Sequence, residues 1–333
     1  MTSFTFEEQR PLDAIVLGRA GVDLYAREAN TDMADISGFN MFVGGSAANI
    51  AVGISKLGGR VGFISCVAQD AFGDYVKRYM SQQNIDLTGM KSDASGSRTS
   101  VAFTEMKPKD CTVLIYRNNA SDLTLAPEDI DQNYLATAKV LVVTGTALAQ
   151  SPSREATLLA MECARKVNTK VVLDVDYRPY SWRSDVDAAL YYDVAAGLAD
   201  IVIGNREEFD MMETIEAPGN GDDDQTAARF LRKHTQVVVI KAGELGSKVY
   251  SRDQEKFAQG IFKVTANKPF GSGDAFAAGL IWTLTHGGSL EEGVRNGSAA
   301  AAINVSGDSC TEAMPSKDAL FEFIANHTEK HRG

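Results

Sequence analysis

The sequence predicts an α/β protein in which helices cover both faces of a mostly parallel sheet. Short apolar runs without polar alternation recur through the 333 residues, and helix-length segments with apolar residues three and four positions apart separate them. Strands buried on both faces of a parallel sheet have this pattern. Regular alternation of such strands with helices is typical of a three-layer α/β/α sandwich. Hydrophobic residues make up 44% of the chain and charged residues 23%, which fits a globular protein.

Each expected strand is a short apolar run, and each expected helix carries its apolar residues on one face. In chain order, we expect strands at 14–17, 61–67, 140–143, 171–175, 201–203 and 237–240. The helices between them are expected at 47–57, 72–80, 154–167 and 226–231. From residue 268 onward the pattern becomes helical, over 274–285, 290–305 and 317–326. Because no repeat or linker divides the chain, we expect one domain over residues 10–330.

Two segments interrupt this alternation. Residues 23–43 and 98–117 are more polar than their surroundings, and the second is expected to form strands at 99–105 and 112–117 joined by a turn at 107–110. We expect these segments to be insertions that form a small β lid over one edge of the main sheet. A hairpin with a purely structural role is the alternative.

The overall charge and the lengths of the apolar runs exclude several classes of partner. The chain has 44 acidic and 33 basic side chains, a formal net charge of −11 at pH 7, which disfavours nucleic-acid binding. Its apolar runs are far shorter than the roughly 20 residues that span a bilayer, and residues 1–11 lack the apolar run of a secretory signal. We therefore expect a cytoplasmic protein with no nucleic-acid or membrane partner.

A turn of small residues followed by a helix is the most informative motif. Residues 268–279 read KPFGSGDAFAAG. Consecutive backbone N–H groups at the positive end of a helix form a cradle for phosphate, and Gly271, Ser272 and Gly273 stand at that position. The carboxylate of Asp274 could accept the proton of a hydroxyl that attacks phosphorus. The alternative is a helix-capping aspartate after a glycine turn.

A second glycine turn opens the helix expected at 47–57, where residues 44–49 read GGSAAN. Glycines allow a ligand to approach the backbone closely, and the amide of Asn49 can both donate and accept hydrogen bonds to a polyol. We therefore expect Gly44, Gly45 and Asn49 to contact a sugar. A tight strand-to-helix turn without a ligand is the alternative.

Together the two glycine turns resemble the two signatures of the PfkB, or ribokinase-like, carbohydrate kinase family. Between them, residues 205–208 (NREE) are similar to the family's NxxE motif, and residues 241–246 (KAGELG) resemble its nucleotide-side turn. The resemblance covers nearly the whole chain. It implies a ribokinase-like sandwich with a β lid, and ATP-dependent phosphorylation of a sugar hydroxyl beneath that lid.

The resemblance also implies roles for individual residues. It makes Asp274 the catalytic base and lets the amides of Gly271 and Gly273 stabilise charge on the transferred phosphoryl group. Mg²⁺ would be oriented by Asn205 and Glu208, with Glu208 acting through water. The further ATP contacts that it implies are Lys241, Gly243, Gly246 and Ser272.

One departure from the family pattern concerns a monovalent cation. Most family members have Asp-Thr immediately before the glycines of this signature, where this chain has Lys268 and Pro269. The aspartate associated with a monovalent-cation site is therefore missing. We hypothesise that the Lys268 ammonium replaces the charge of that cation, so that potassium is not required.

Three charged residues point to the class of sugar. Asp23 follows the first strand, where the family grips substrate hydroxyls, while Arg117 ends a lid strand and Arg178 follows a core strand. Two guanidinium groups beside a polyol pocket suggest a carboxylate on the sugar. Solvent-exposed arginines are the alternative, and the sequence does not distinguish which one meets the carboxylate.

The sequence around these residues, in the stretches GRAGVDLY, IYRNNASD, DYRPYSW and KPFGSGDAFA, is most similar to the family's kinases of 5-dehydro-2-deoxygluconate, a sugar acid of myo-inositol catabolism. The implied reaction transfers the γ-phosphoryl group of ATP to the C6 hydroxyl. Two alternatives are 2-dehydro-3-deoxygluconate as substrate and a non-catalytic sugar-acid-binding protein on the same fold. The expected partners are the sugar acid, ATP with Mg²⁺ and, through the lid, a second copy of the chain.

Overall fold

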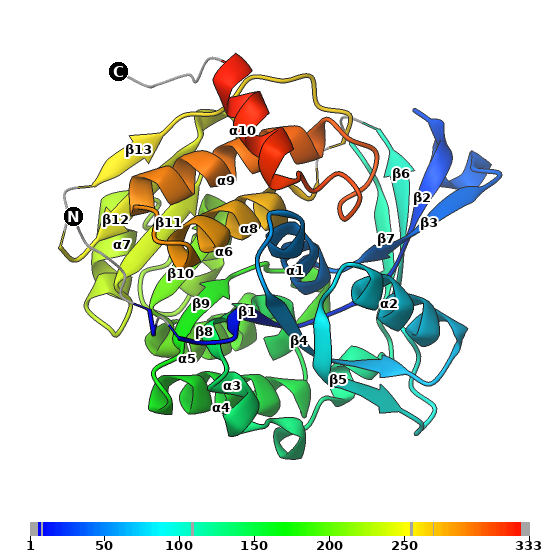
Figure 1. The fold of residues 1–333 in the computed structure, drawn as a ribbon, viewed down its shortest axis with the longest axis horizontal. Coiled ribbons are helices and arrows are strands. Elements are labelled where there is room, and N and C mark those ends of the chain that lie inside the picture. Colours follow the sequence, from blue (N-terminus) through cyan, green and yellow to red (C-terminus); the bar gives the residue numbers. More distant parts are fainter. Residues whose placement is uncertain (1–5, 8, 108–109, 254–255, 269, 328–333) are drawn as a thin grey trace.

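A computed structural model describes residues 6–7, 9–107, 110–253, 256–268 and 270–327. Within these residues nine strands form one large sheet in the order β13-β12-β11-β10-β9-β8-β1-β4-β5, with helices on both faces (Figure 1). This is the three-layer α/β/α sandwich expected from the sequence. Pro269, the middle of the turn expected at 107–110 and the end of the 10–330 range lie outside the described residues.

The large sheet is mainly parallel. The seven neighbouring strands β5, β4, β1, β8, β9, β10 and β11 pair in parallel. At the other edge, β12 pairs antiparallel with β11 and with β13. The strands are β1 (Leu12–Leu17), β4 (Val61–Ala68), β5 (Asp86–Asp93), β8 (Ala138–Thr144), β9 (Lys170–Asp174), β10 (Ile201–Asn205), β11 (Val237–Lys241), β12 (Ser247–Ser251) and β13 (Phe257–Gln259). The strand order reverses between β1 and β8. Ligands of parallel sheets bind at such a reversal, outside the carboxyl ends of the strands.

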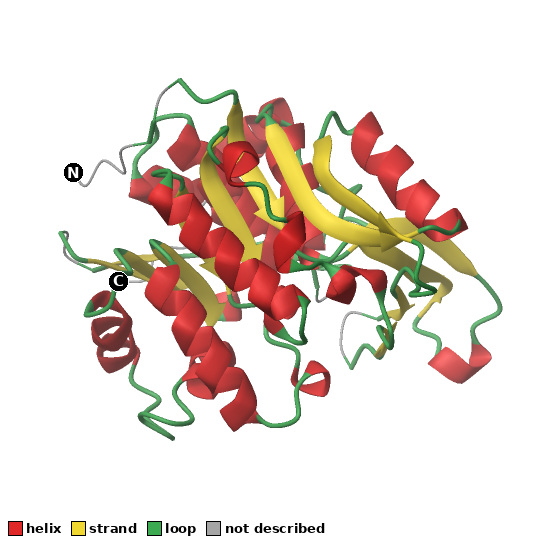
Figure 2. Cartoon of the chain, turned by 90° about the horizontal axis from the view of Figure 1, so that it is seen from below, coloured by secondary structure: helices red, strands yellow, loops and turns green. Residues whose placement is uncertain are grey.

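Each face of the sheet packs against its own hydrophobic core. In β1, Ala14 and Val16 point into one core, whereas Ile15 and Leu17 point into the other, as the two-residue period of a strand requires. The first core is covered by α1 (Ser46–Lys56), α2 (Ala71–Gln82), α8 (Ser272–Thr285), α9 (Leu290–Val305) and α10 (Lys317–Asn326). The second is covered by α3 (Gln132–Leu135), α4 (Ser153–Lys166), α5 (Asp185–Leu198), α6 (Arg206–Met212) and α7 (Asp223–Leu231). Figure 2 shows strands between helices.

A second, smaller sheet projects from one edge of the molecule (Figure 1). Within the described residues it has the order β3-β2-β6-β7. Its strands are β2 (Gly21–Ala29), β3 (Phe39–Gly44), β6 (Val101–Met106) and β7 (Val113–Tyr116). The strands expected at 99–105 and 112–117 are therefore present as β6 and β7, and β2 and β3 lie in the other polar segment.

Several elements were not expected from the sequence, among them α3, α5, α6, β5, β12 and β13. Helix α5 was missed because its solvent face is apolar, with Val186, Leu190 and Val194 exposed by 55%, 52% and 46%, so the segment lacks a clear polar side. Strand β5 was missed because it is an edge strand with mostly polar residues. In the described part of the chain, no helix has both the length and the apolar composition to span a membrane.

Candidate active site

A cavity of about 1550 Å³ lies where the carboxyl ends of β1, β8, β9, β10 and β11 meet the second sheet. It thus includes the reversal of strand order between β1 and β8. It reaches from the second sheet, through residues such as Tyr25 and Ile115, to α9, through residues such as Ala302. A cavity of this volume can hold two small molecules.

The structure brings together nearly all the residues singled out in the sequence. Those lining the cavity are Asp23, Gly45, Asn49, Arg117, Arg178, Asn205, Glu208, Lys241, Gly243, Gly246, Gly271, Ser272, Gly273 and Asp274. Gly44, expected to contact a sugar, is absent from this lining. A Cβ on Gly44 would lie 1.9 Å from Cγ of Asp23, so the missing side chain instead makes room for the Asp23 carboxylate.

Asp274 lies in the first turn of α8 and is held by the other glycine-turn helix. Ser46 Oγ donates to Asp274 Oδ1 at 2.5 Å, and Asn49 Nδ2 donates to Asp274 Oδ2 at 2.7 Å. Burial, reinforced by the nearby Asp176 carboxylate, raises the pKa of Asp274 to about 6, although these two hydrogen bonds lower it. A carboxylate with a pKa near neutrality is ionised at pH 7 and is still basic enough to take a proton from a hydroxyl.

The turn before α8 has the geometry of an anion cradle. Gly271 has φ of +88°, and a Cβ there would lie 2.6 Å from Cys310 Sγ, so a side chain would both strain the backbone and collide. The Lys241 ammonium approaches from β11, since a Cβ on Gly273 would lie 3.1 Å from Lys241 Nζ. Amide groups and an ammonium therefore face the same space, as phosphate binding requires.

Asp174 at the end of β9 holds this lysine, and it was not predicted as a site residue. Asp174 Oδ1 lies 3.5 Å from Lys241 Nζ. Burial lowers the pKa of Lys241, but Asp174 and nearby carboxylates outweigh it and raise the pKa overall. Burial also raises the pKa of Asp174 to about 7. In the sequence, Asp174 stands at the end of a buried strand, four residues before Arg178, but this pattern does not indicate that Asp174 pairs with Lys241.

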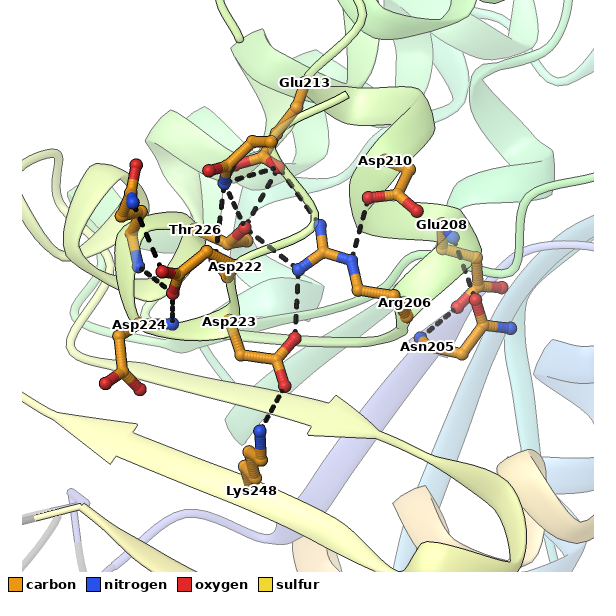
Figure 3. Close-up of polar contacts among 12 residues, drawn as sticks. Asn205, Arg206, Glu208, Asp210, Glu213, Asp222, Asp223, Asp224, Thr226 and Lys248 are labelled. Carbon is orange, nitrogen blue, oxygen red and sulfur yellow. Dashed lines mark hydrogen bonds and ion pairs between the residues drawn. The ribbon is translucent and has the colours of Figure 1, made fainter. Parts of the chain in front are cut away.

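Asn205 and Glu208 form a reciprocal cap at the start of α6 (Figure 3). Asn205 Oδ1 accepts from the Glu208 amide at 2.8 Å, and Glu208 Oε2 accepts from the Asn205 amide at 2.7 Å. The other carboxylate oxygen accepts from the Tyr177 amide at 3.1 Å. Arg206 points away toward Asp223 and fixes α6 against α7 (Figure 3).

This cap fits a magnesium ion held through water better than one ligated directly. Both Glu208 oxygens already accept backbone hydrogen bonds, but each retains a lone pair for a coordinated water. Among the described residues, no three His, Cys, Asp or Glu side chains are grouped to hold a metal ion. A Mg²⁺ ion at this cap would be contacted through its waters.

At the end of the cavity near the second sheet, a buried carboxylate has unused hydrogen-bonding capacity. Asp23 Oδ2 accepts from the Tyr25 hydroxyl at 3.3 Å, and Asp23 Oδ1 lies 3.6 Å from Arg19 Nη2. Within the described residues, Asp23 Oδ1 and Asn49 Oδ1 are buried without a hydrogen-bond partner. Unpaired buried acceptors are costly, and the hydroxyl groups of a sugar could satisfy both.

The two predicted arginines differ in what they can still bind. Arg117 donates through Nε and Nη2 to Asp122 Oδ2 at 3.0 and 2.5 Å, and through Nη2 to the Thr146 carbonyl at 3.0 Å. Arg178 pairs with Asp176 at 2.6 Å, but its side chain is 46% exposed. The proximity of Asp176 raises the pKa of Arg178. Arg178 also donates through Nη1 to the Tyr177 carbonyl at 3.2 Å, but its exposure makes it the more accessible of the two predicted arginines to a carboxylate.

Arg19 is a third guanidinium in this pocket, and it was not predicted. It is 8% exposed, lines the cavity and donates to Ser100 Oγ at 2.8 Å. The position of Arg19, two residues after the first buried strand, was the feature of the sequence from which it could have been predicted.

The far end of the cavity has an apolar wall. Residues not singled out in the sequence form this wall: Phe262, Val264, Ala301, Ala302, Val305 and Phe323. The turn between β11 and β12 borders it; Gly246 has φ of +85°, and a Cβ there would lie 2.0 Å from the Gln259 carbonyl oxygen. This end suits a flat, apolar ring next to the anion cradle.

Comparison with known proteins agrees with this geometry. Residues 12–317 match the pfkB family carbohydrate kinases. The chain is 76% identical to the 5-dehydro-2-deoxygluconokinase of Photobacterium profundum, over 97% of this chain and 98% of that protein. It is 45% identical to the 5-dehydro-2-deoxygluconokinase of Geobacillus kaustophilus, over 98% of each.

A solved structure shows that the fold is shared as well. A putative ribokinase II from E. coli, in complex with ATP and Mg²⁺, superposes with a TM-score of 0.84 at 21% identity and covers 95% of this chain and 100% of that one. The expected ribokinase-like fold is therefore confirmed. On the family match and these identities, the chain belongs to the PfkB family of carbohydrate kinases.

Proposed function

We propose that the chain uses ATP to phosphorylate the C6 hydroxyl of 5-dehydro-2-deoxy-D-gluconate, a step of myo-inositol catabolism. One observation carries the proposal: the buried Asp274 carboxylate lies between an anion cradle and a pocket with unpaired acceptors and an available guanidinium. The name of the relatives that are 76% and 45% identical supports this choice of substrate.

In this mechanism the chain positions two substrates and moves one proton. Asp274 accepts the proton of the C6 hydroxyl as the oxygen attacks the γ-phosphorus of ATP; the new O–P bond forms, the bond to the β-phosphate oxygen breaks, and ADP leaves. The amides of Gly271 to Gly273 and the Lys241 ammonium stabilise the charge on the transferred group. Mg²⁺, when bound, neutralises phosphate charge, and Asn205 and Glu208 orient its waters.

The sugar acid is bound in this mechanism by the end of the cavity near the second sheet. Asp23 and Asn49 offer their unpaired oxygens to sugar hydroxyls, and Arg178 binds the C1 carboxylate. At the other end, Gly243, Gly246 and Ser272 contact ATP, whose adenine packs on the apolar wall.

We further propose that residues 10–330 act as one kinase domain whose lid consists of segments 23–43 and 98–117. Tyr25, Ala102, Thr104 and Ile115 of the second sheet line the cavity, which supports closure of this sheet over the sugar. Closure excludes water from the phosphoryl group and so prevents ATP hydrolysis. The proposal places the enzyme in the cytoplasm, where ATP is supplied.

We also propose that two copies pair through their lids. Leu114 and Tyr116 of β7 alternate with residues that line the cavity, so they point to the opposite face, where they are 41% and 62% exposed. Phe103 packs against Tyr116 and Phe39 with ring centroids 5.4 Å apart in each pair, which extends this apolar surface. Light scattering tests the proposal, which expects twice the chain mass of 35.8 kDa.

An ADP-release assay on two sugar acids tests the proposed function. The enzyme is given ATP and Mg²⁺ with either 5-dehydro-2-deoxygluconate or 2-dehydro-3-deoxygluconate. We expect a clear preference in kcat/KM for the former. Preference for the latter would keep the kinase mechanism but refute the substrate. No ADP release with either sugar acid, together with binding of one of them in calorimetry, would indicate a non-catalytic protein.

A further inference from the structure

A buried lysine binds the carbonyl of Phe270, the residue just before the anion cradle, and the mechanism above gives this lysine no role. Lys268 is 0% exposed, and its Nζ donates to the Phe270 carbonyl at 3.0 Å and to Asn304 Oδ1 at 2.7 Å. Both acceptors are neutral, and among the described residues no carboxylate forms an ion pair with this ammonium. A buried charge without a counter-charge is costly, so its presence beside the site calls for a physical explanation.

The ammonium fixes the orientation of the cradle through one peptide group. The Phe270 carbonyl and the Gly271 amide belong to the same planar trans peptide, so they point in opposite directions. Because Lys268 binds the Phe270 carbonyl, the Gly271 N–H points away from the ammonium, and both Lys268 and Gly271 border the cavity. A rotated peptide would present a carbonyl oxygen to the phosphate instead.

The second acceptor anchors the ammonium to the rest of the fold. Asn304 is 0% exposed at the end of α9, and its Nδ2 donates to the Cys310 carbonyl at 2.7 Å. A Cβ on Gly271 would lie 2.7 Å from Asn304 Oδ1, so the amide packs against the cradle itself. Lys268 thus joins the cradle, the end of α9 and the loop that follows it.

These contacts do not fit an additional monovalent cation at this position. A potassium-sized cation is bound by carbonyl-type oxygens that replace its water, and the Phe270 and Asn304 oxygens are of that type. The Lys268 ammonium already occupies the space between them at hydrogen-bond distance. It supplies the same single positive charge, but it is attached to the chain.

We propose that Lys268 is a positioning residue that serves as a built-in monovalent cation, orienting the Gly271 amide for phosphoryl transfer and making turnover independent of potassium. The proposal rests on the proposed kinase function for its rate measurements only. Its stability measurements concern the Lys268 site directly and do not require turnover.

Chemical rescue of a truncated side chain tests the proposal. We compare wild type, Lys268→Ala, which leaves space for an added cation, and Lys268→Met, which fills the space without charge. The matched control is Lys139→Ala, because Lys139 is a partly buried ammonium, bound to Asp13 and the Thr285 carbonyl at 2.8 and 2.9 Å but outside the cavity lining. Each is assayed in K⁺, NH₄⁺, Na⁺ and tetramethylammonium chloride at equal ionic strength.

We expect wild-type kcat to change less than about twofold among the four salts. Lys268→Ala should lose about 100-fold in kcat, comparable to the loss of one oriented donor, with KM for the sugar acid nearly unchanged. K⁺ or NH₄⁺ should raise the kcat of Lys268→Ala by at least about tenfold, but should not raise the kcat of Lys268→Met. The melting temperature of Lys268→Ala should rise in K⁺ relative to tetramethylammonium, whereas those of wild type and Lys139→Ala should not.

Three results would overturn the proposal: strong activation of wild type by K⁺ over Na⁺, near wild-type kcat in Lys268→Ala without added cation, or a loss that no small cation reverses in either rate or melting temperature. If Lys268→Ala does not fold, the proposal is still tested by the salt series on wild type and Lys268→Met: kcat of wild type should not depend on K⁺, and K⁺ should not raise kcat of Lys268→Met. If wild type turns over neither sugar acid in any salt, the proposed function fails, while the melting temperatures still test the role of Lys268.

Discussion

The hydrogen bond from Ser46 to Asp274 sets the pH range in which the proposed base can work. The pKa of Asp274 is raised by burial to about 6, and the Ser46 hydroxyl at 2.5 Å opposes this rise by stabilising the ionised form. Because the base must be ionised to accept a proton, wild-type kcat/KM should rise with pH through a midpoint of about 6. Below that pH Asp274 is protonated, and turnover should be lost.

Ser46→Ala removes one hydrogen bond to a charged group, worth about 1.5 to 3 kcal/mol. At 1.36 kcal/mol per pKa unit, the midpoint should move upward by roughly 1 to 2 units, to about 7.5. About one tenth of Asp274 would then be ionised at pH 6.5, against about three quarters in wild type, so kcat/KM should fall about eightfold at pH 6.5 and recover near pH 9.

The assay is ADP release across pH 5 to pH 9 in a buffer of constant ionic strength. Ser65→Ala is the matched control, because Ser65 is 1% exposed on β4, its hydroxyl has no hydrogen-bond partner among the described residues, and it does not line the cavity. Its midpoint should equal that of wild type. A midpoint for Ser46→Ala at or below the wild-type value would refute the assignment of Asp274 as a base tuned by Ser46.

Two other predictions concern sugar binding. Arg178→Ala should raise KM for the sugar acid by about 10- to 100-fold, because one charged contact with the substrate is lost. Arg117→Ala should mainly lower the melting temperature, because it leaves the buried Asp122 carboxylate, 5% exposed, without its cation. Equal effects on KM would contradict this division. Gly44→Ala places a Cβ 1.9 Å from Asp23 Cγ, so it should raise KM for the sugar acid while leaving KM for ATP nearly unchanged; a selective effect on ATP would argue against Asp23 as a sugar ligand.

The fold was predictable where burial leaves a pattern in the sequence. Apolar runs such as 140–143 and 237–240 became central strands because a parallel sheet is buried on both faces. Helix α5 escaped because Val186, Leu190 and Val194 are exposed, and solvent exposure of apolar residues removes the amphipathic pattern. Which strand pairs with β6 could not be predicted either, since its parallel partner β2 is distant in the chain.

The candidate site was predictable as a set of residues but not as a set of contacts. Gly271 and Asp274 were predictable because a glycine turn before a helix is a pattern of consecutive residues. The hydrogen bond between Ser46 and Asp274 joins positions 228 apart, and no local pattern reports it. The difference between Arg117 and Arg178 likewise depends on Asp122 as a tertiary partner, so it required the structure.

The most direct test of the proposed mechanism separates binding from turnover at Asp274. Asp274→Asn keeps the size of the side chain. Its one carbonyl oxygen can still accept from the Asn49 amide and its NH2 group can donate to the Ser46 hydroxyl, but the amide cannot take a proton. Calorimetry should give a dissociation constant for 5-dehydro-2-deoxygluconate within about threefold of wild type, while kcat should fall by about 10³-fold or more. Turnover within tenfold of wild type, with binding intact, would contradict the claim that this carboxylate is the base of a sugar-acid kinase.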